Sequence, residues 1–206
     1  MTLSRLVLWR HGETEYNASG RMQGQLDAAL TQIGWNQARF AVPALARFSP
    51  DLVVASDLRR ATDTATVFTN ATGVPLRIDK RLRETNLGIW QGLTSSQVDE
   101  QWPGTRRIWQ TDPTFSPPGG ESRVEVAARA YEVIADLDRA DDGVSTAMIC
   151  AHGGLTSALT GSLLELPLTA WAKLGGISNC HWNVLERRTS SGLAWRLIAY
   201  NAGITG

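Results

Sequence analysis

Two of the three histidines in this chain of 206 residues stand close behind an apolar run and directly before glycine. His11 follows the run 5–9 and one arginine, and His152 follows the run 146–151. Short apolar runs that end at a turn residue are typical of buried strands, and the carboxyl ends of such strands form the functional edge of an open α/β sheet. If the two strands are neighbours in one parallel sheet, both imidazoles meet at this edge.

Arginine is the second residue type that the pattern brings to this edge. Arg10 precedes the first of these histidines, and Arg60 falls in the first turn of a predicted helix, where the helix dipole disfavours a cation unless an anion lies beside it. Arg59 is expected to be solvated. A guanidinium group can donate two parallel hydrogen bonds to two oxygens of a phosphate, and the main-chain amides of Gly153 and Gly154 would add donors. The pattern therefore predicts a phosphate site.

A carboxylate would complete the chemistry of such a site. Glu84 follows the predicted strand 74–79 at the same edge and is a candidate general acid; the alternative is a surface ion pair with Arg81 or Arg83. Glu121 is the second candidate for the proton donor. A metal site is not expected, because the arginines repel a cation and no acidic cluster with metal-ligand spacing accompanies the histidines.

Composition places the chain among ordinary globular proteins. Its length predicts one domain, and its 20 basic and 20 acidic residues give no net charge that would attract nucleic acid or an anionic membrane. Cys150 and Cys180 are the only cysteines and form no C-x-x-C pair, and no apolar stretch is long enough to span a membrane. We therefore expect a cytoplasmic protein without structural zinc and without nucleic-acid or membrane partners.

Capping residues and periodicity predict the first helices. Thr31 is expected to cap a helix that Pro43 kinks or breaks near Ala41. Ser56 or Asp57 is expected to cap the next helix, which carries the two arginines in its first turn.

Three further segments are assigned from their composition. Segment 13–29 is polar and shows no sustained period, so it is predicted as a loop that turns polar groups toward the first histidine. Segment 94–120 contains Trp, Phe and Pro; we predict a cap insertion with two short helices, whose tryptophans pack against one another or stack on a sugar. Ser122 and Glu125 form a capping box that begins the next long helix.

Four blocks of the sequence occur in the order of a known family. They are Arg10-His11-Gly12-Glu13-Thr14, Ser56-x-Leu58-x-Arg60-Ala61-x-x-Thr64-Ala65, Leu82-x-Glu84 and Ala151-His152-Gly153-Gly154. Together they span almost the whole chain and resemble the histidine phosphatase (phosphoglycerate mutase-like) superfamily. The resemblance implies a three-layer α/β fold with a mostly parallel central sheet flanked by helices, in one domain over 1–206 with a small cap at about 94–120.

The resemblance also implies roles for individual residues. His11 would be the nucleophile and Glu84 the acid and base. The phosphate oxygens would be held by Arg10, Arg60 and His152. Secondary contacts to the substrate are implied for Asn17, Gln23, Gly24 and Gly153. The resemblance implies no metal and no organic cofactor, and it suggests a homodimer.

Within the family, the sequence favours the phosphatase branch over the mutases. Glu84 is not followed by the Arg-His-Tyr-Gly run usual in mutases, and Gln25 stands where mutases tend to have Trp. Segments 21–27, 82–94 and 119–124 resemble phosphatases of a small phosphorylated sugar acid. The alternatives are a phosphoglycerate mutase, a phosphatase of broad specificity, and a module that only binds a phosphorylated ligand. Glu84 argues against the last of these, since binding alone needs no proton donor.

Overall fold

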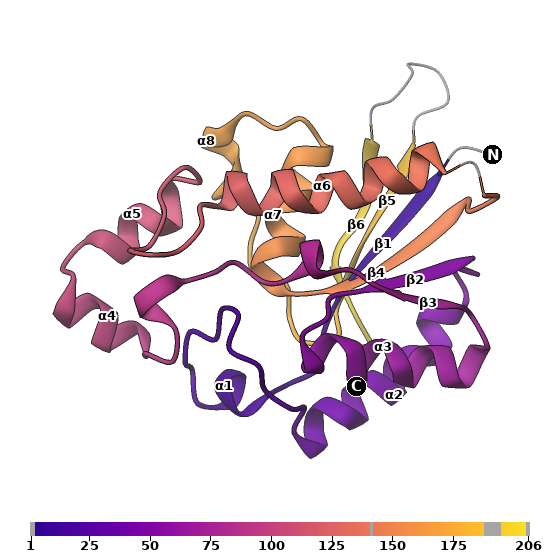
Figure 1. The fold of residues 1–206 in the computed structure, drawn as a ribbon, viewed down its shortest axis with the longest axis horizontal. Coiled ribbons are helices and arrows are strands. Elements are labelled where there is room, and N and C mark those ends of the chain that lie inside the picture. Colours follow the sequence, from indigo (N-terminus) through magenta and orange to yellow (C-terminus); the bar gives the residue numbers. More distant parts are fainter. Residues whose placement is uncertain (1–2, 141, 188–194, 205–206) are drawn as a thin grey trace.

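The computed structural model describes residues 3–140, 142–187 and 195–204. Its centre is a six-stranded sheet with the order β3-β2-β4-β1-β5-β6, in which the first four strands of that order run parallel and the last two are antiparallel to their neighbours (Figure 1). The strands are β1 (Arg5–Arg10), β2 (Leu52–Ala55), β3 (Leu76–Ile78), β4 (Thr146–Ala151), β5 (Trp182–Arg187) and β6 (Trp195–Ala202). The predicted α/β fold with a mostly parallel sheet is confirmed. Among the described residues, no helix has the length and apolar character needed to cross a membrane.

Strands β1 and β4 are neighbours in this sheet and lead to the two histidines. Their register pairs Arg10 with Ala151, so His11 and His152 are the next residues on the two strands. The main-chain N–H of His11 donates to the carbonyl of Ala151 at 3.0 Å. Almost every residue of both strands is buried, as is typical of parallel strands that are covered on both faces. The prediction that these two strands lie side by side is correct.

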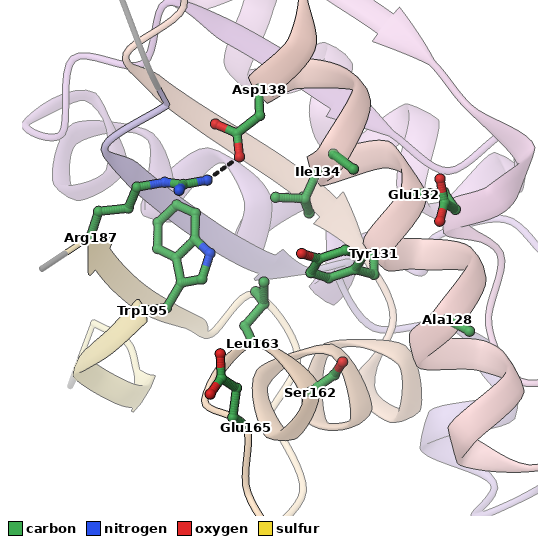
Figure 2. Close-up of a pocket in the computed structure, with 11 residues that line it drawn as sticks. Ala128, Tyr131, Glu132, Ile134, Asp138, Ser162, Leu163, Glu165, Arg187 and Trp195 are labelled. Carbon is green, nitrogen blue, oxygen red and sulfur yellow. Dashed lines mark hydrogen bonds and ion pairs between the residues drawn. The ribbon is translucent and has the colours of Figure 1, made fainter. Parts of the chain in front are cut away.

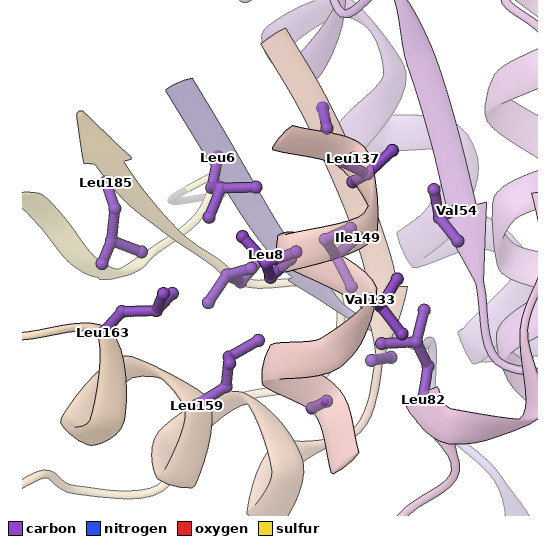
Figure 3. Packing of buried hydrophobic residues seen from close by; sticks show 14 of the residues in the cluster. Leu6, Leu8, Val54, Leu82, Val133, Leu137, Ile149, Leu159, Leu163 and Leu185 are labelled. Carbon is purple, nitrogen blue, oxygen red and sulfur yellow. The ribbon is translucent and has the colours of Figure 1, made fainter. Parts of the chain in front are cut away.

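Helices cover both faces of the sheet, which gives three layers (Figure 1). Leu6 and Leu8 of β1 pack with the helices of one face, in the core that Figure 3 shows. Val7 and Trp9 point the other way and pack with the helices of the second face. The helices are α6 (Arg123–Arg139) and α7 (Gly153–Leu163) on the first face, and α2 (Gln32–Ala46) and α3 (Arg59–Thr72) on the second.

Helix α2 continues through Pro43 to Ala46, so the predicted alternative of a break near Ala41 is wrong. Thr31 caps the helix as predicted, since its hydroxyl accepts the N–H of Gly34 at 3.0 Å. Pro43 lies in the exposed last part of the helix, so the carbonyl that lacks a partner there faces water. Ala41 and Leu45 are buried on the opposite side and hold the helix on the sheet.

Segment 13–29 contains a short helix that the sequence prediction missed. Helix α1 (Glu15–Ala18) begins with a capping box, in which Thr14 and Asn17 satisfy each other's main-chain N–H groups. Its four residues are too few to show an apolar period, which is why only the capping pair could have revealed it.

Helix α3 takes its cap from a distant loop, and neither Ser56 nor Asp57 caps it as predicted. The carboxylate of Asp27 accepts the main-chain N–H of Arg59 at 2.8 Å. Asp57 instead forms an ion pair with Arg83 at 2.7 Å. A cap that comes from 32 residues earlier leaves no local signal in the sequence.

A separate apolar cluster lies beside the sheet edge, formed mainly by residues 87–115 with Met22. Trp90 is fully buried at its centre, and Trp102, Trp109 and Phe115 pack around it. The predicted short helices are present as α4 and α5, and Thr94 caps the first of them with a capping box. The helices of this region are η1 (Lys80–Leu82), η2 (Gly88–Trp90), α4 (Ser95–Gln101) and α5 (Thr105–Thr111); α8 (Leu168–Trp171) follows α7.

Candidate active site

A small cavity of about 180 Å³ opens at the carboxyl ends of β1 and β4. Most of the residues predicted for the site line it: Arg10, His11, Asn17, Gln23, Gly24, Arg60 and Glu84. The other two lie directly behind its wall. The ring of His152 is centred 5.2 Å from that of His11, and Gly153 lies against the side chain of Arg10.

His11 presents an unprotonated ring nitrogen toward this cavity. Its Nδ1 lies 2.6 Å from the carbonyl oxygen of Gly12. A carbonyl only accepts, so Nδ1 carries the proton and Nε2 keeps its lone pair. The pKa of His11 lies well below its usual range, mainly because of burial and then because of the positive charges of Arg10 and Arg60. The imidazole is therefore neutral near pH 7, the state in which it can act as a nucleophile.

Arg60 joins the two histidines to the loop of segment 13–29. Its Nε donates to Nε2 of His11 at 3.3 Å and to Nδ1 of His152 at 3.2 Å. Its two terminal nitrogens donate to the carbonyls of Gly24 and Leu26 at 2.7 and 2.8 Å. Burial lowers the pKa of Arg60 to about 10, so the guanidinium remains charged at neutral pH. The expectation that Arg60 lies inside the protein is correct.

His152 presents a hydrogen-bond donor where His11 presents a lone pair. Because its Nδ1 accepts from Arg60, the neutral ring carries its proton on Nε2. The pKa of His152 is far below its usual range, first through burial and then through the charges of Arg60, His11 and Arg10. Its Nε2 is buried and has no partner among the described residues. Such a donor is costly unless a ligand oxygen accepts from it.

Arg10, which is half-buried, adds a second cation with a donor still available. One of its terminal nitrogens donates to the carbonyl of Ile177 at 2.5 Å, which fixes the guanidinium. Its Nε is buried and lacks a partner within the described part of the chain. Burial lowers the pKa of Arg10, which stays a strong base. Together with Arg60 and His152 it makes the cavity a site for a compact anion.

Glu84 lies on the same cavity, and its carboxylate is held by main-chain donors. Its Oε1 accepts from the N–H groups of Thr85 and Leu155 at 2.8 and 2.9 Å, and its Oε2 accepts from that of Gly154 at 2.9 Å. Glu84 forms no ion pair with Arg81 or Arg83. The expectation that the amide of Gly154 is available to a phosphate is wrong, because the first turn of α7 binds the carboxylate instead.

Glu121, the second candidate for the proton donor, faces away from this cavity. It forms an ion pair with Arg129 at 2.9 Å and accepts the main-chain N–H of Asn86 at 2.8 Å. Arg129 in turn donates to the carbonyls of Glu84 and Arg81 at 3.0 and 2.6 Å. The pair therefore supports the segment that carries Glu84.

The loop residues on the cavity are tied to one another and to the C-terminal part of the chain. Thr14 donates to the amide oxygen of Gln23 at 3.1 Å. Asn179 donates to the amide oxygen of Asn17 at 3.1 Å and to the carbonyl of His11 at 3.0 Å. Asn179 was not predicted as a site residue. It lies three residues before β5, and nothing in the sequence of that segment points to the histidines.

A larger cavity, of about 530 Å³, lies elsewhere on the molecule (Figure 2). Arg187 on its wall pairs with Asp138 and stacks on Trp195, and Glu132 and Glu165 add negative charge. Since Arg5 pairs with Glu186 in the register of β1 and β5, this cavity lies toward the other end of the sheet. Its acidic wall disfavours an anion.

Comparisons with known proteins agree with this geometry. The sequence model of one protein family, the histidine phosphatase superfamily (branch 1), matches residues 6–202 of this chain. Glucosyl-3-phosphoglycerate phosphatase of Mycobacterium tuberculosis is 46% identical over 214 residues, which cover 98% of this chain and 96% of that protein. The protein of the same name from Mycolicibacterium vanbaalenii is 45% identical over 216 residues, with the same coverage. The structure of mycobacterial glucosyl-3-phosphoglycerate phosphatase Rv2419c in complex with VO3 superposes with a TM-score of 0.91 at 46% identity, over 97% of this chain and 100% of that one.

Proposed function

Because this chain belongs to the histidine phosphatase superfamily, we propose that it hydrolyses a phosphomonoester through a phosphohistidine on His11. The single observation that carries the proposal is the placement of a neutral imidazole, with Nε2 unprotonated, on the cavity beside the guanidinium groups of Arg10 and Arg60. A neutral histidine can attack phosphorus, and arginines stabilise the charge of the transferring group. A module that only binds would not need that lone pair.

In the first step, Nε2 of His11 attacks phosphorus and the bond to the substrate oxygen breaks. The oxygens of the transferring group would lie against Arg60, the unpartnered Nε–H of Arg10 and the unpartnered Nε2–H of His152. Glu84 donates a proton to the leaving alkoxide. The products of this step are the free alcohol and phosphorylated His11.

In the second step, a water molecule attacks the phosphohistidine, and Glu84 takes its proton. Inorganic phosphate leaves, and Nε2 regains its lone pair. The arrangement around Glu84 supports both roles: Oε1 accepts from two main-chain N–H groups and from the hydroxyl of Thr85, whereas Oε2 accepts from Gly154 alone. Oε2 therefore has a free position that can carry the proton for the leaving alkoxide and, once deprotonated, can accept a proton from the water.

For the substrate, we propose glucosyl-3-phosphoglycerate, which would give glucosylglycerate and phosphate. The support is the printed function of the two mycobacterial relatives, each similar to this chain over nearly its full length. The cavity is smaller than the sites that enclose whole drug-sized ligands, so it suits the phosphate and leaves the sugar outside. A cytoplasmic location, a homodimer, and a single domain in which residues 94–120 cap the site stay predictions.

The test is phosphate release by the purified full-length chain in the presence of EDTA. We expect release from glucosyl-3-phosphoglycerate to exceed release from 3-phosphoglycerate, and rapid quenching to trap acid-labile phosphate on the protein. H11Q should abolish both signals. If H11Q stays active, the covalent route is wrong.

A mutase assay with a bisphosphoglycerate primer distinguishes the proposed phosphatase from a phosphoglycerate mutase. The chain is incubated with 3-phosphoglycerate and a bisphosphoglycerate primer, and both isomer formation and phosphate release are followed. Isomer formation that outpaces phosphate release would replace the hydrolase by a mutase.

A further inference from the structure

The cations on the active-site cavity fall into two groups. Arg60 is buried and Arg10 half-buried beside His11, where the phosphoryl group would be transferred. Arg21 lines the same cavity but is exposed to solvent. It also lines a neighbouring open cavity of about 380 Å³, together with Glu15, Tyr16, Ser19 and Gly92. Among the described residues, Arg21 is the one that both cavities share, so it stands where a substrate leaves the phosphate site.

The guanidinium of Arg21 is fixed in place and still has donors to offer. One terminal nitrogen donates to the carbonyl of Gly92 at 2.8 Å, and the main-chain N–H donates to Tyr16 at 2.9 Å. A guanidinium carries five N–H donors, and one bond to a carbonyl leaves the rest of the fork open. Within the described ranges, no carboxylate lies in ion-pair distance of Arg21, whereas Arg59 and Arg83 are paired with Asp63 and Asp57.

Other cations near the cavity are already occupied. Arg129 is paired with Glu121 and bound to two carbonyls. Arg123 stacks on the ring of Trp109 and donates to the main-chain carbonyl of that residue. Of the described cations that line the cavity, Arg21 is thus the one that lies away from His11 and is left for a second negative group of a substrate.

We propose that Arg21 binds the carboxylate of the substrate and so selects phosphorylated acids over uncharged phosphate esters. The inference rests on the proposed function and adds a specificity residue to it. In a 3-phosphoglycerate ester, the carboxylate is separated from phosphorus by only a few bonds. With the phosphate bound at His11, the rest of the substrate must extend through the opening of a small cavity, where the guanidinium of Arg21 has unbonded N–H groups. A planar guanidinium matches a carboxylate in bidentate fashion.

The experiment compares two esters on wild-type protein, R21M and R21K. One ester is glucosyl-3-phosphoglycerate, and the other is the same molecule with the carboxylate reduced to a hydroxymethyl group. We expect R21M to lower the ratio of kcat/KM for the two esters by about 10- to 100-fold, which corresponds to the loss of one charged hydrogen-bonded contact. R21K keeps the charge without the fork and should lower the ratio by about 3- to 10-fold.

R59M is the matched control, because Arg59 is an exposed arginine on a neighbouring element and does not line the cavity. It should leave the ratio within about twofold of the wild type, which excludes a general effect of surface charge. If R21M slows both esters equally, Arg21 only supports the loop and the inference is overturned. If R21M does not fold, the ratio for R21K decides. Wild-type protein that releases phosphate from neither ester would overturn the proposed function itself, and that result is distinguishable from a failure confined to the ratio.

Discussion

The main-chain N–H of Gly154, in the first turn of α7, donates to Oε2 of Glu84 at 2.9 Å, across 70 residues of sequence. This bond places the candidate proton donor relative to the strand that ends at His152. The position of Gly154 is also tight, because a Cβ built there would lie 2.7 Å from Oε1 of Glu84. Removing the space at Gly154 should therefore disturb the carboxylate and little else.

We predict that G154A folds normally and loses activity. Alanine suits a helix better than glycine by up to about 1 kcal/mol, so thermal stability should be equal or higher. The displaced carboxylate should lower kcat by about 10- to 100-fold, an estimate below the full contribution of a general acid. G176A is the control, because a Cβ at that position has no neighbour within 4 Å. Full activity of G154A would show that the position of Glu84 in this structure does not matter for turnover.

We predict that E84Q slows the phosphorylation of His11 by the natural ester far more than its phosphorylation by an ester with a good leaving group. An alkoxide needs a proton to leave, so the rate of phosphorylation by the natural substrate should fall by about 10²- to 10⁴-fold. The phosphorylation step with p-nitrophenyl phosphate needs no such proton, so phosphorylated protein should form and persist because its hydrolysis lacks a base. Quenched-flow measurement of protein-bound phosphate checks this. If E84Q slows the reaction of both esters equally and phosphorylated protein does not accumulate, Glu84 has a structural role.

We predict that Arg129 acts on catalysis through Glu84 as a positioning residue. It donates to the carbonyls of Glu84 and Arg81 while it is paired with Glu121. R129M should lower kcat for the natural ester by about tenfold, with less effect on p-nitrophenyl phosphate. Combined with E84Q it should add little, because both changes remove the same proton transfer. R139M is the control at the exposed end of α6. If the losses in kcat of R129M and E84Q are fully additive, Arg129 does not act through Glu84.

We predict that acid destabilises the fold through the two buried histidines. Burial and neighbouring arginines hold the pKa values of His11 and His152 well below the usual value of about 6.5. Below this value the unfolded chain binds more protons than the folded one, so the unfolding free energy falls as pH falls. Each histidine contributes a slope of up to about 1.4 kcal/mol per pH unit until its folded-state pKa is reached.

Urea unfolding between about pH 7 and pH 5.5 measures this slope. H11Q should reduce this slope by the share of one histidine. An identical slope in H11Q and the wild type would contradict the assignment.

Sequence predicted the parts of this site that depend on local patterns. The runs before His11 and His152 identify their strands, and the rule on strand ends then brings the two residues to one edge. Thr31 and Ser122 cap helices through partners three residues away, so their signals are local as well.

The parts that sequence could not predict depend on contacts between distant segments. Asp27 caps α3 from 32 residues away, and the amides of α7 bind Glu84 instead of a phosphate. Asn179 reaches His11 and Asn17 because β5 lies next to β1 in antiparallel orientation. Each of these bonds uses a polar side chain or amide whose partner is set by the packed fold, and no spacing in the chain reveals it.

The cluster around Trp90 is packed separately from the two cores on the faces of the sheet, as far as the described residues extend. It also supplies Leu87 and Trp109 to the wall of the active-site cavity. Substitutions among these aromatic residues should therefore alter the entrance of the active-site cavity without destabilising the strands that position His11 and His152. The architecture offers an evolutionary route by which new metabolites are admitted while an old reaction is kept.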